Sequence, residues 1–257
     1  MHVFYRMSDA GNTRKRVNGA NNISCLQNFL QNFRLGPRDS LFILADKLED
    51  RNYEEVMEML NTCETKWLVI VSQANSEAES FKFLLNQAFL TDILDTDYVY
   101  FLEDDFIHLP EARDGLEEGL LIADYATPYL HPDKFIPPNK GGNPLLDEKG
   151  GETTQVYFGG TAFWMLTNST GMVFATTMKI LKEDKDLWYW AVSAKTSKDF
   201  EVFMRLRDEK NRTLAMPIPA WATHSELASI SPDVGIGYCC WENVLRGTCG
   251  HPKVIYA

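Results

Sequence analysis

The stretch that decides the fold is Asp97-Tyr98-Val99-Tyr100-Phe101-Leu102-Glu103-Asp104-Asp105. Its successive apolar residues predict a strand that is buried on both faces, as strands inside a parallel sheet are. In open α/β sheets, ligands bind at the carboxyl ends of the strands. Three consecutive carboxylates at such an end repel one another unless a cation lies among them. We therefore predict a divalent metal ion that carries a phosphorylated substrate; the alternative is a solvated acidic turn.

Length, composition and charge limit the possible functions. The 257 residues suffice for one large α/β domain with a substantial core. The net charge of -11 argues against a nucleic-acid-binding surface, which needs clustered Lys and Arg. No apolar stretch approaches the roughly 20 residues of a membrane helix, and we expect no signal peptide. Five cysteines, an odd number without a CxxC pair, suit a reducing cytosol better than secretion.

Four metal-binding side chains lie near the C-terminus and raise the question of a zinc site. They are Cys239, Cys240, Cys249 and His251. Their spacing fits no common structural zinc pattern, so we do not predict zinc there.

The first half of the sequence alternates strand and helix signals. Between the first two strands, for example, Leu26, Phe29, Leu30 and Phe33 follow the helical spacing i, i+3, i+4, i+7. Repeated β-α units imply a mainly parallel sheet with right-handed crossovers. We predict strands at 3–7, 41–45, 67–71 and 98–102.

The second half is less regular. Proline and glycine are frequent between 127 and 151, in a segment too long for a simple connector, so we predict a functional loop or lid. No internal repeat is visible, and we predict one domain over residues 1–257. The elements expected here are helices at 110–125, 171–182 and 199–207, a strand at 155–166, and a tail without clear periodicity over 222–257.

The acidic residues after the strand have a defined geometry in an extended backbone. Glu103 and Asp105 lie two residues apart and project to the same side, whereas Asp104 points the other way unless the strand has already turned. A hard divalent cation binds oxygen ligands and keeps positions open for substrate phosphates. Such a cation also offsets the negative charge that develops when a diphosphate leaves.

At these residues the chain resembles GT-A type glycosyltransferases, a family whose strand-end acidic signature (D-x-D, often E-D-D) holds Mn²⁺ or Mg²⁺ under the diphosphate of a nucleotide sugar. Glu103-Asp104-Asp105 matches that signature. The resemblance covers nearly the whole length and is to the small single-domain bacterial and viral members. The other matching stretches are Tyr5-Arg6-Met7-Ser8-Asp9, Cys25-Leu26-Gln27-Asn28-Phe29, Ala45-Asp46, Ser80-Phe81, His131-Pro132-Asp133-Lys134, Thr223-His224, Ser231-Pro232 and Trp241.

The resemblance implies a fold and an activity. The fold class is α/β: a GT-A, Rossmann-like, mainly parallel central sheet flanked by helices. A nucleotide-binding half over about 1–105 precedes an irregular acceptor-side half over about 106–257. The activity is metal-dependent transfer of a sugar, with inversion, from a nucleotide diphosphate sugar to a glycan or other hydroxyl acceptor. Mn²⁺ or Mg²⁺ is the implied cofactor.

The resemblance also assigns the donor side of the site. Asp105 coordinates the metal, and Glu103 or Asp104 reaches the ribose or the sugar. His224 returns to the site as a further metal ligand, since imidazole suits Mn²⁺ beside carboxylate; a surface or capping histidine is the alternative. The other residues expected to bind the nucleotide sugar are Arg6, Ser8, Asp9, Lys15 of the basic run 14–16, Asp46 and Ser80.

An inverting transferase needs a carboxylate base that takes the proton of the acceptor hydroxyl. A retaining mechanism is the alternative and needs no dedicated base. Asp199 resembles the family's base at the start of a helix, and Glu201 is the second candidate. The family's commoner version has an acid where Lys198 stands. The alternative is that Asp199 is a helix N-terminal acid, favoured there by the helix dipole.

Acceptor contacts are expected from four residues. Gly160 opens a strand where glycine permits close approach of a ligand. Trp164 could stack on a sugar, although core packing is the alternative for an aromatic residue in a strand. His131 and Asp133 are the other two candidates and follow the segment at Tyr125.

Two other functions stay open at this point. A sugar-nucleotide pyrophosphorylase has a similar sheet but needs a Gly-rich, Arg-containing loop after the first strand, of which 11–14 is a poor version. A non-catalytic nucleotide-sugar-binding module would keep the fold but lack the base. The presence of Lys198 where the family commonly has an acid leaves this function possible. We expect no nucleic-acid partner and no transmembrane segment. The expected location is the cytoplasm of a bacterial cell or of a virus-infected host cell.

Overall fold

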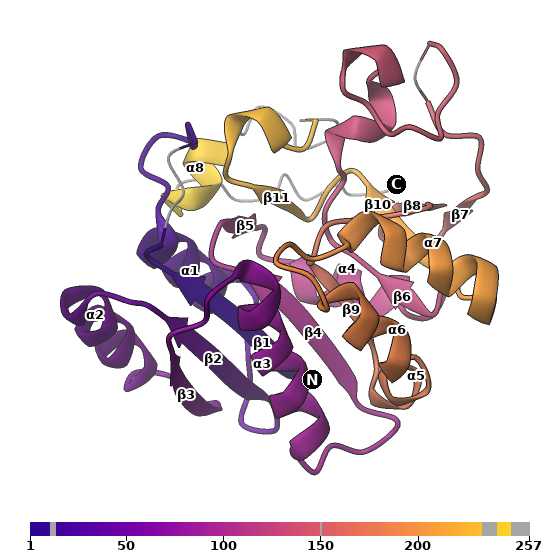
Figure 1. The fold of residues 1–257 in the computed structure, drawn as a ribbon. Coiled ribbons are helices and arrows are strands. Elements are labelled where there is room, and N and C mark those ends of the chain that lie inside the picture. Colours follow the sequence, from indigo (N-terminus) through magenta and orange to yellow (C-terminus); the bar gives the residue numbers. More distant parts are fainter. Residues whose placement is uncertain (11–13, 150, 233–240, 248–257) are drawn as a thin grey trace.

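Eleven strands form the sheets in the residues that the computed structural model describes, which are 1–10, 14–149, 151–232 and 241–247. They are β1 (His2–Ser8), β2 (Ser40–Asp46), β3 (Lys66–Ser72), β4 (Tyr98–Glu103), β5 (Phe106–His108), β6 (Tyr125–Ala126), β7 (Val156–Phe158), β8 (Phe163–Leu166), β9 (Phe174–Thr177), β10 (Leu214–Ile218) and β11 (Ala222–His224). Nine of them form one sheet in the order β3-β2-β1-β4-β9-β6-β10-β8-β7 (Figure 1). The β11 and β5 strands form a separate antiparallel pair.

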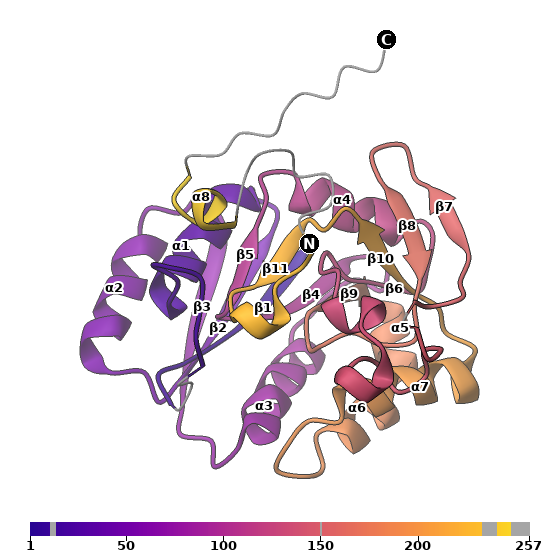
Figure 2. The ribbon, with the colours of Figure 1, turned by 90° about the horizontal axis from the view of Figure 1, so that it is seen from above.

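The strands β3, β2, β1 and β4 are parallel, as the sequence predicts. In this register Arg6 lies opposite Glu103, and Ser8 lies opposite Asp46. The carboxyl ends of β1, β2 and β4 therefore meet at one edge of the sheet. Figures 1 and 2 together show the β11–β5 pair above this edge.

Helices cover both faces of the sheet because its central strands alternate their side chains between two cores. Tyr5 of β1 packs in the core beneath α1, α2, α4 and α8, and Phe4 packs in the core beneath α3, α5, α6 and α7. The helices are α1 (Asn22–Asn32), α2 (Asp50–Leu60), α3 (Glu77–Leu90), α4 (Ala112–Gly119), α5 (Met178–Glu183), α6 (Lys185–Ala191), α7 (Asp199–Lys210) and α8 (Trp241–Leu245), with 3-10 turns η1 (Pro132–Phe135), η2 (Pro138–Lys140) and η3 (Leu227–Ser229). None of the described helices is long and apolar enough to cross a membrane.

The helix predicted over 110–125 is wrong in its second half. The helix α4 ends at Gly119, and Tyr125 and Ala126 form β6 between β9 and β10. Tyr125 is fully buried, and its hydroxyl donates to Asp184 at 2.9 Å. Pairing in the sheet and burial of this ring therefore outweigh the helical periodicity.

The strand predicted over 155–166 is a hairpin of β7 and β8. Gly160 makes its turn with a φ of 122°, a conformation that favours glycine. Inside the turn, the carboxylate of Glu118 accepts hydrogen bonds from the backbone N–H and the hydroxyl of Thr161.

The other predictions for the second half are only partly correct. The segment 171–182 contains β9 before α5, because Phe174 to Thr177 pair with β4. The segment 222–257 contains β11, η3 and α8. The four side chains of the weighed zinc site, Cys239, Cys240, Cys249 and His251, lie outside the described residues.

The long loop over 127–151 is tied to the connection between β8 and β9. The Nζ of buried Lys134 donates to Asn168 Oδ1 and to Ser169 Oγ, each at 2.8 Å. Asn143 donates to the same Asn168 oxygen at 2.9 Å. This polar cluster fixes the part of the loop that follows His131.

We expect Gly119→Ala to destabilise the protein. A Cβ at Gly119 would lie 2.5 Å from the Cζ3 atom of Trp164 and 3.0 Å from the Cβ of Ala126. Overpacking of this kind costs about 1–3 kcal/mol, which outweighs the roughly 1 kcal/mol that alanine gains over glycine in a helix. The midpoint of urea unfolding should fall accordingly.

Gly171→Ala is the matched control, because nothing lies within 4 Å of a Cβ at that position. Its unfolding midpoint should stay near that of the wild type. An unchanged midpoint for Gly119→Ala would contradict the packing of Trp164 against α4.

Candidate active site

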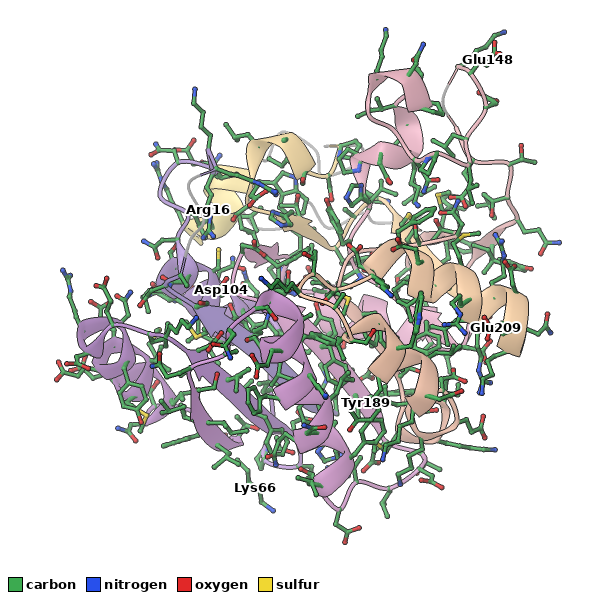
Figure 3. The ribbon with its side chains drawn as sticks, viewed as in Figure 1. Arg16, Lys66, Asp104, Glu148, Tyr189 and Glu209 are labelled. Carbon is green, nitrogen blue, oxygen red and sulfur yellow. The ribbon has the colours of Figure 1, made fainter. Side chains whose placement is uncertain are left out.

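A pocket of about 430 Å³, here called the central pocket, opens where β1 and β4 end. It shares lining residues with two neighbouring pockets. The loop-side pocket, of about 510 Å³, shares Ser8, Arg14 and Arg16 with it. The helix-side pocket, of about 270 Å³, shares Arg6, Arg14, Glu77, Glu103 and His224. Figure 3 shows Arg16 above Asp104, and both residues line the central pocket.

Asp105, His224 and Glu226 form a candidate metal site on the wall of the central pocket. One ligand atom from each lies within 4.8 Å of the others. The Nε2 atom of His224 is 3.2 Å from Oδ2 of Asp105, because β11 pairs with β5 and sets His224 opposite Phe106. The backbone N–H of Glu226 donates to Nδ1 of His224 at 3.1 Å and orients Nε2 toward Asp105.

The donor set fits a divalent cation. The Oδ1 atom of Asp105 is buried and has no hydrogen-bond partner among the described residues. An orphaned buried carboxylate oxygen is costly unless a cation or a donor reaches it. Two carboxylates and an imidazole together suit Mn²⁺, and the carboxylates also suit Mg²⁺.

Burial governs the electrostatics of this site. It raises the pKa of Asp105 to about 7, with the charge of Glu103 adding to the effect. Burial also lowers the pKa of His224 to about 4. Both shifts disfavour the charged forms, because burial removes water from both side chains. Near neutral pH the imidazole is therefore neutral, the form that binds metals.

Asp104 and Glu103 are held by β1. The backbone N–H of Ser8 donates to Oδ2 of Asp104 at 2.7 Å. Burial and the neighbouring Asp105 raise the pKa of Asp104. Glu103 forms an ion pair with Arg6. Burial alone would lower the pKa of Arg6, but the charge of Glu103 raises it above its ordinary value. Glu103 thus lies between the central and helix-side pockets, with its charge balanced by Arg6.

Asp199 lines the helix-side pocket at the start of α7. Burial raises the pKa of Asp199, and the charges of Glu103 and Glu77 add to that shift. Glu201 is exposed and does not line the pocket. The helix-side pocket thus contains one of the two predicted candidate bases.

His131 is the predicted acceptor residue that lines the helix-side pocket. Its Nδ1 atom lies 2.8 Å from Oδ1 of Asp133, so Asp133 orients the ring. Trp164 is fully buried, and its indole N–H donates to Glu118 at 2.8 Å. It is therefore a core residue, the alternative to stacking on a sugar. Gly160 makes the turn of the β7–β8 hairpin and lines neither the central nor the helix-side pocket.

The predicted nucleotide-binding residues are spread over different environments. Asp9 lines the loop-side pocket, but its carboxylate accepts from Asn22, Asn52 and the N–H of Glu49. Asp46 accepts from the Ser72 hydroxyl and the N–H of Ala74. Lys15 is exposed, whereas its neighbours Arg14 and Arg16 line the pockets. Ser80 is buried inside α3.

Two acidic residues that line the pockets were not predicted, Glu226 and Glu77. Glu226 follows His224 by two residues in an extended segment, and that H-x-E spacing is a signal that would have suggested a shared ligand site. Glu77 lines the central and helix-side pockets from the first turn of α3. Acidic residues are common in first helical turns, so its sequence position carried no signal.

Comparison with solved structures settles the fold class. A fragment of S. aureus TarS, residues 1–349, superposes with a TM-score of 0.51 at 12% identity, covering 84% of this chain and 58% of the fragment. The chain has a GT-A-like fold. A longer S. aureus TarS structure gives 0.51 at 13% identity, covering 84% of this chain and 35% of TarS. The 1–349 fragment in complex with UDP-GlcNAc gives 0.48 at 11% identity, with 84% and 56% covered.

The chain thus spans little more than half of the TarS fragment that it matches. No protein-family model and no curated protein sequence matches the chain. At this level of identity the comparison confirms the predicted α/β architecture with its mainly parallel central sheet, and it does not extend to individual residues.

We expect the affinity for Mn²⁺ to rise with pH up to neutrality. Because the pKa of Asp105 is raised to about 7, the metal-free site holds a proton below that pH, and metal binding must release it. Affinity should rise by up to roughly tenfold per pH unit between about pH 5 and 7 and level off above. Titration calorimetry in buffers of different ionisation enthalpy measures both the affinity for Mn²⁺ and the number of protons released on binding.

Asp105→Asn should bind Mn²⁺ weakly and without this pH dependence. Glu148→Gln is the control, since Figure 3 shows Glu148 at the far end of the long loop. Wild-type affinity that does not change with pH would contradict the assignment of Asp105.

Proposed function

We propose that the protein is a metal-dependent glycosyltransferase that moves a sugar from a nucleoside diphosphate donor to a hydroxyl acceptor with inversion. The observation that carries this proposal is the placement of two different carboxylate sites in adjoining pockets. Asp105 faces His224 and Glu226 in the central pocket, and Asp199 lies in the helix-side pocket. Glu103 and Arg6 line both.

The loop-side and central pockets would hold the donor. Arg14 and Arg16 line both pockets and offer positive charge to a diphosphate. Asp105, His224 and Glu226 would hold a divalent cation, which neutralises charge on the departing diphosphate when bound. The GT-A-like fold supports this assignment, and S. aureus TarS, which shares that fold, has been crystallised with UDP-GlcNAc.

The helix-side pocket would hold the acceptor. The acceptor oxygen forms a bond to the anomeric carbon as the bond from that carbon to the diphosphate oxygen breaks. Asp199 takes the hydroxyl proton, and the electron pair of the broken bond leaves with the nucleoside diphosphate. The raised pKa of Asp199 suits this role, because a base is most effective when its pKa approaches the working pH.

We expect Asp199→Asn to lower turnover by about 10²–10⁴-fold, the usual contribution of a general base. Mn²⁺ affinity should not change, because Asp199 lies outside the Asp105–His224–Glu226 group. The assay is release of nucleoside diphosphate from UDP-GlcNAc and other nucleotide sugars, with Mn²⁺ and with water or sugars as acceptors.

Two variants on the same helix accompany this test. Glu209→Gln lies at the far end of α7, where Glu209 pairs with Arg205, and should behave as wild type. A loss of turnover in Glu201→Gln with none in Asp199→Asn would reverse the assignment of the base.

The same assay separates the transferase from the alternative activities. A transferase releases nucleoside diphosphate, and Asp105→Ala should abolish the release. Pyrophosphate formed from a nucleoside triphosphate and a sugar phosphate would identify a pyrophosphorylase instead. Nucleotide-sugar binding without turnover by any donor would identify a binding module, and binding that needs no divalent cation would refute the metal-dependent proposal.

A further inference from the structure

We propose that Glu77 is a positioning residue that holds the start of α7, and with it Asp199, against the helix-side pocket. The role of Asp199 as a base rests on the proposed function; the placement of Asp199 by Glu77 does not.

Glu77 binds the segment that leads directly into α7. One carboxylate oxygen accepts the backbone N–H of Ser197 at 2.8 Å, and the other accepts the Ser197 hydroxyl at 2.6 Å. The next N–H of α3, that of Ala78, donates to the carbonyl of Lys195. Glu77 therefore connects α3 to a residue two positions before Asp199.

The start of α7 has no side-chain N-cap, a feature that it shares with α2, α4 and α6. Helices α1, α3 and α5 begin with side-chain caps from Asn21, Ser76 and Thr177. In α7 the N-cap is Lys198, whose side chain makes no capping hydrogen bond. Its Nζ lies over the ring of Trp190, 4.2 Å from the centroid. In its first turn, Oδ1 of Asp199 accepts the N–H of Phe200 at 2.8 Å, and the bidentate contact of Glu77 with Ser197 adds an anchor from outside the helix.

The position of Glu77 also sets the charge around Asp199. The groups that raise the pKa of Asp199 come from three elements: Glu103 on β4, Glu77 on α3 and Glu201 on α7 itself. Arg6 and His131 line the same pocket, and Arg6 pairs with Glu103. Removing the charge of Glu77 should therefore lower the pKa of Asp199, because one repelling neighbour is lost.

A charge of this kind is well placed at the start of α3. The N-terminus of a helix carries partial positive charge that stabilises a carboxylate. The same first turn contains Glu79, which accepts from the N–H and side chain of Asn75 at 2.7 and 3.0 Å. Glu79 thus accepts hydrogen bonds from the segment just before its own helix, whereas Glu77 accepts hydrogen bonds from the segment just before α7.

The test compares Glu77→Gln, Glu77→Ala and Ser197→Ala with Glu79→Gln as the matched control. Hydrogen exchange of the backbone amides at 197–201 reports how firmly the start of α7 is held. Carboxyl-detected NMR titration of Asp199 reports its pKa. We expect faster exchange in Glu77→Ala and Ser197→Ala, and a lower pKa of Asp199 in Glu77→Gln. Both quantities should be unchanged in Glu79→Gln.

The kinetic counterpart is a fall in kcat of roughly tenfold to a hundredfold in Glu77→Ala, with the KM for the donor nearly unchanged, since misplacement by about 1 Å has effects of that size. In Glu77→Gln the acidic limb of the pH profile should move to lower pH. Wild-type exchange and an unchanged pKa of Asp199 in all Glu77 variants would overturn the inference. Changes in both, in a protein that shows no transfer with any donor, would refute the proposed function and leave the positioning role in place.

Discussion

The crowding of buried carboxylates at the end of β4 is the constraint on which the site depends. Asp105 is buried, the adjacent Asp104 is half-buried, and Arg6 and Arg16 oppose their charges. Burying charge of one sign is costly unless counter-charge or hydrogen bonds are supplied. The chain supplies a backbone N–H from β1 for Asp104 and a histidine from β11 for Asp105. Among the residues that the structure describes, Oδ1 of Asp105 has no hydrogen-bond partner. A bound cation would satisfy that oxygen.

The pockets on either side of this carboxylate cluster are built by different parts of the fold. The side proposed for the donor is lined by the ends of β1 and β4 and by described residues of the loop after β1. The opposite side uses α7, the loop after β6 and η3, which reach the edge from the second half of the chain. The Arg6–Glu103 ion pair lies between the two sides and lines both pockets. Glu77 adds a direct connection from α3 to α7.

The sequence predicted the first half well and the second half poorly, for one reason. Strands such as β1 and β2 carry long apolar runs, and helices such as α1 show clear periodicity, so local pattern and burial agree. The strands β6 and β9 have two and four residues and exist because they pair with β10 and β4, which lie far along the chain. In the site, Asp105 and His224 were predicted as partners through a family resemblance. Glu77 was missed because its role depends on which segments meet, whereas Glu226 was missed although its spacing from His224 could have indicated it.

By itself, the sequence determined the class of the fold and the edge of the sheet where chemistry is concentrated, because an apolar run that ends in three acids is a local pattern. Only the tertiary structure decided which distant side chains face those acids. It set His224 beside Asp105 by pairing β11 with β5, exposed Glu201, and tied Asp199 to Glu77 through Ser197. These outcomes follow from strand register and helix placement, which are set by packing across the whole chain rather than by neighbouring residues.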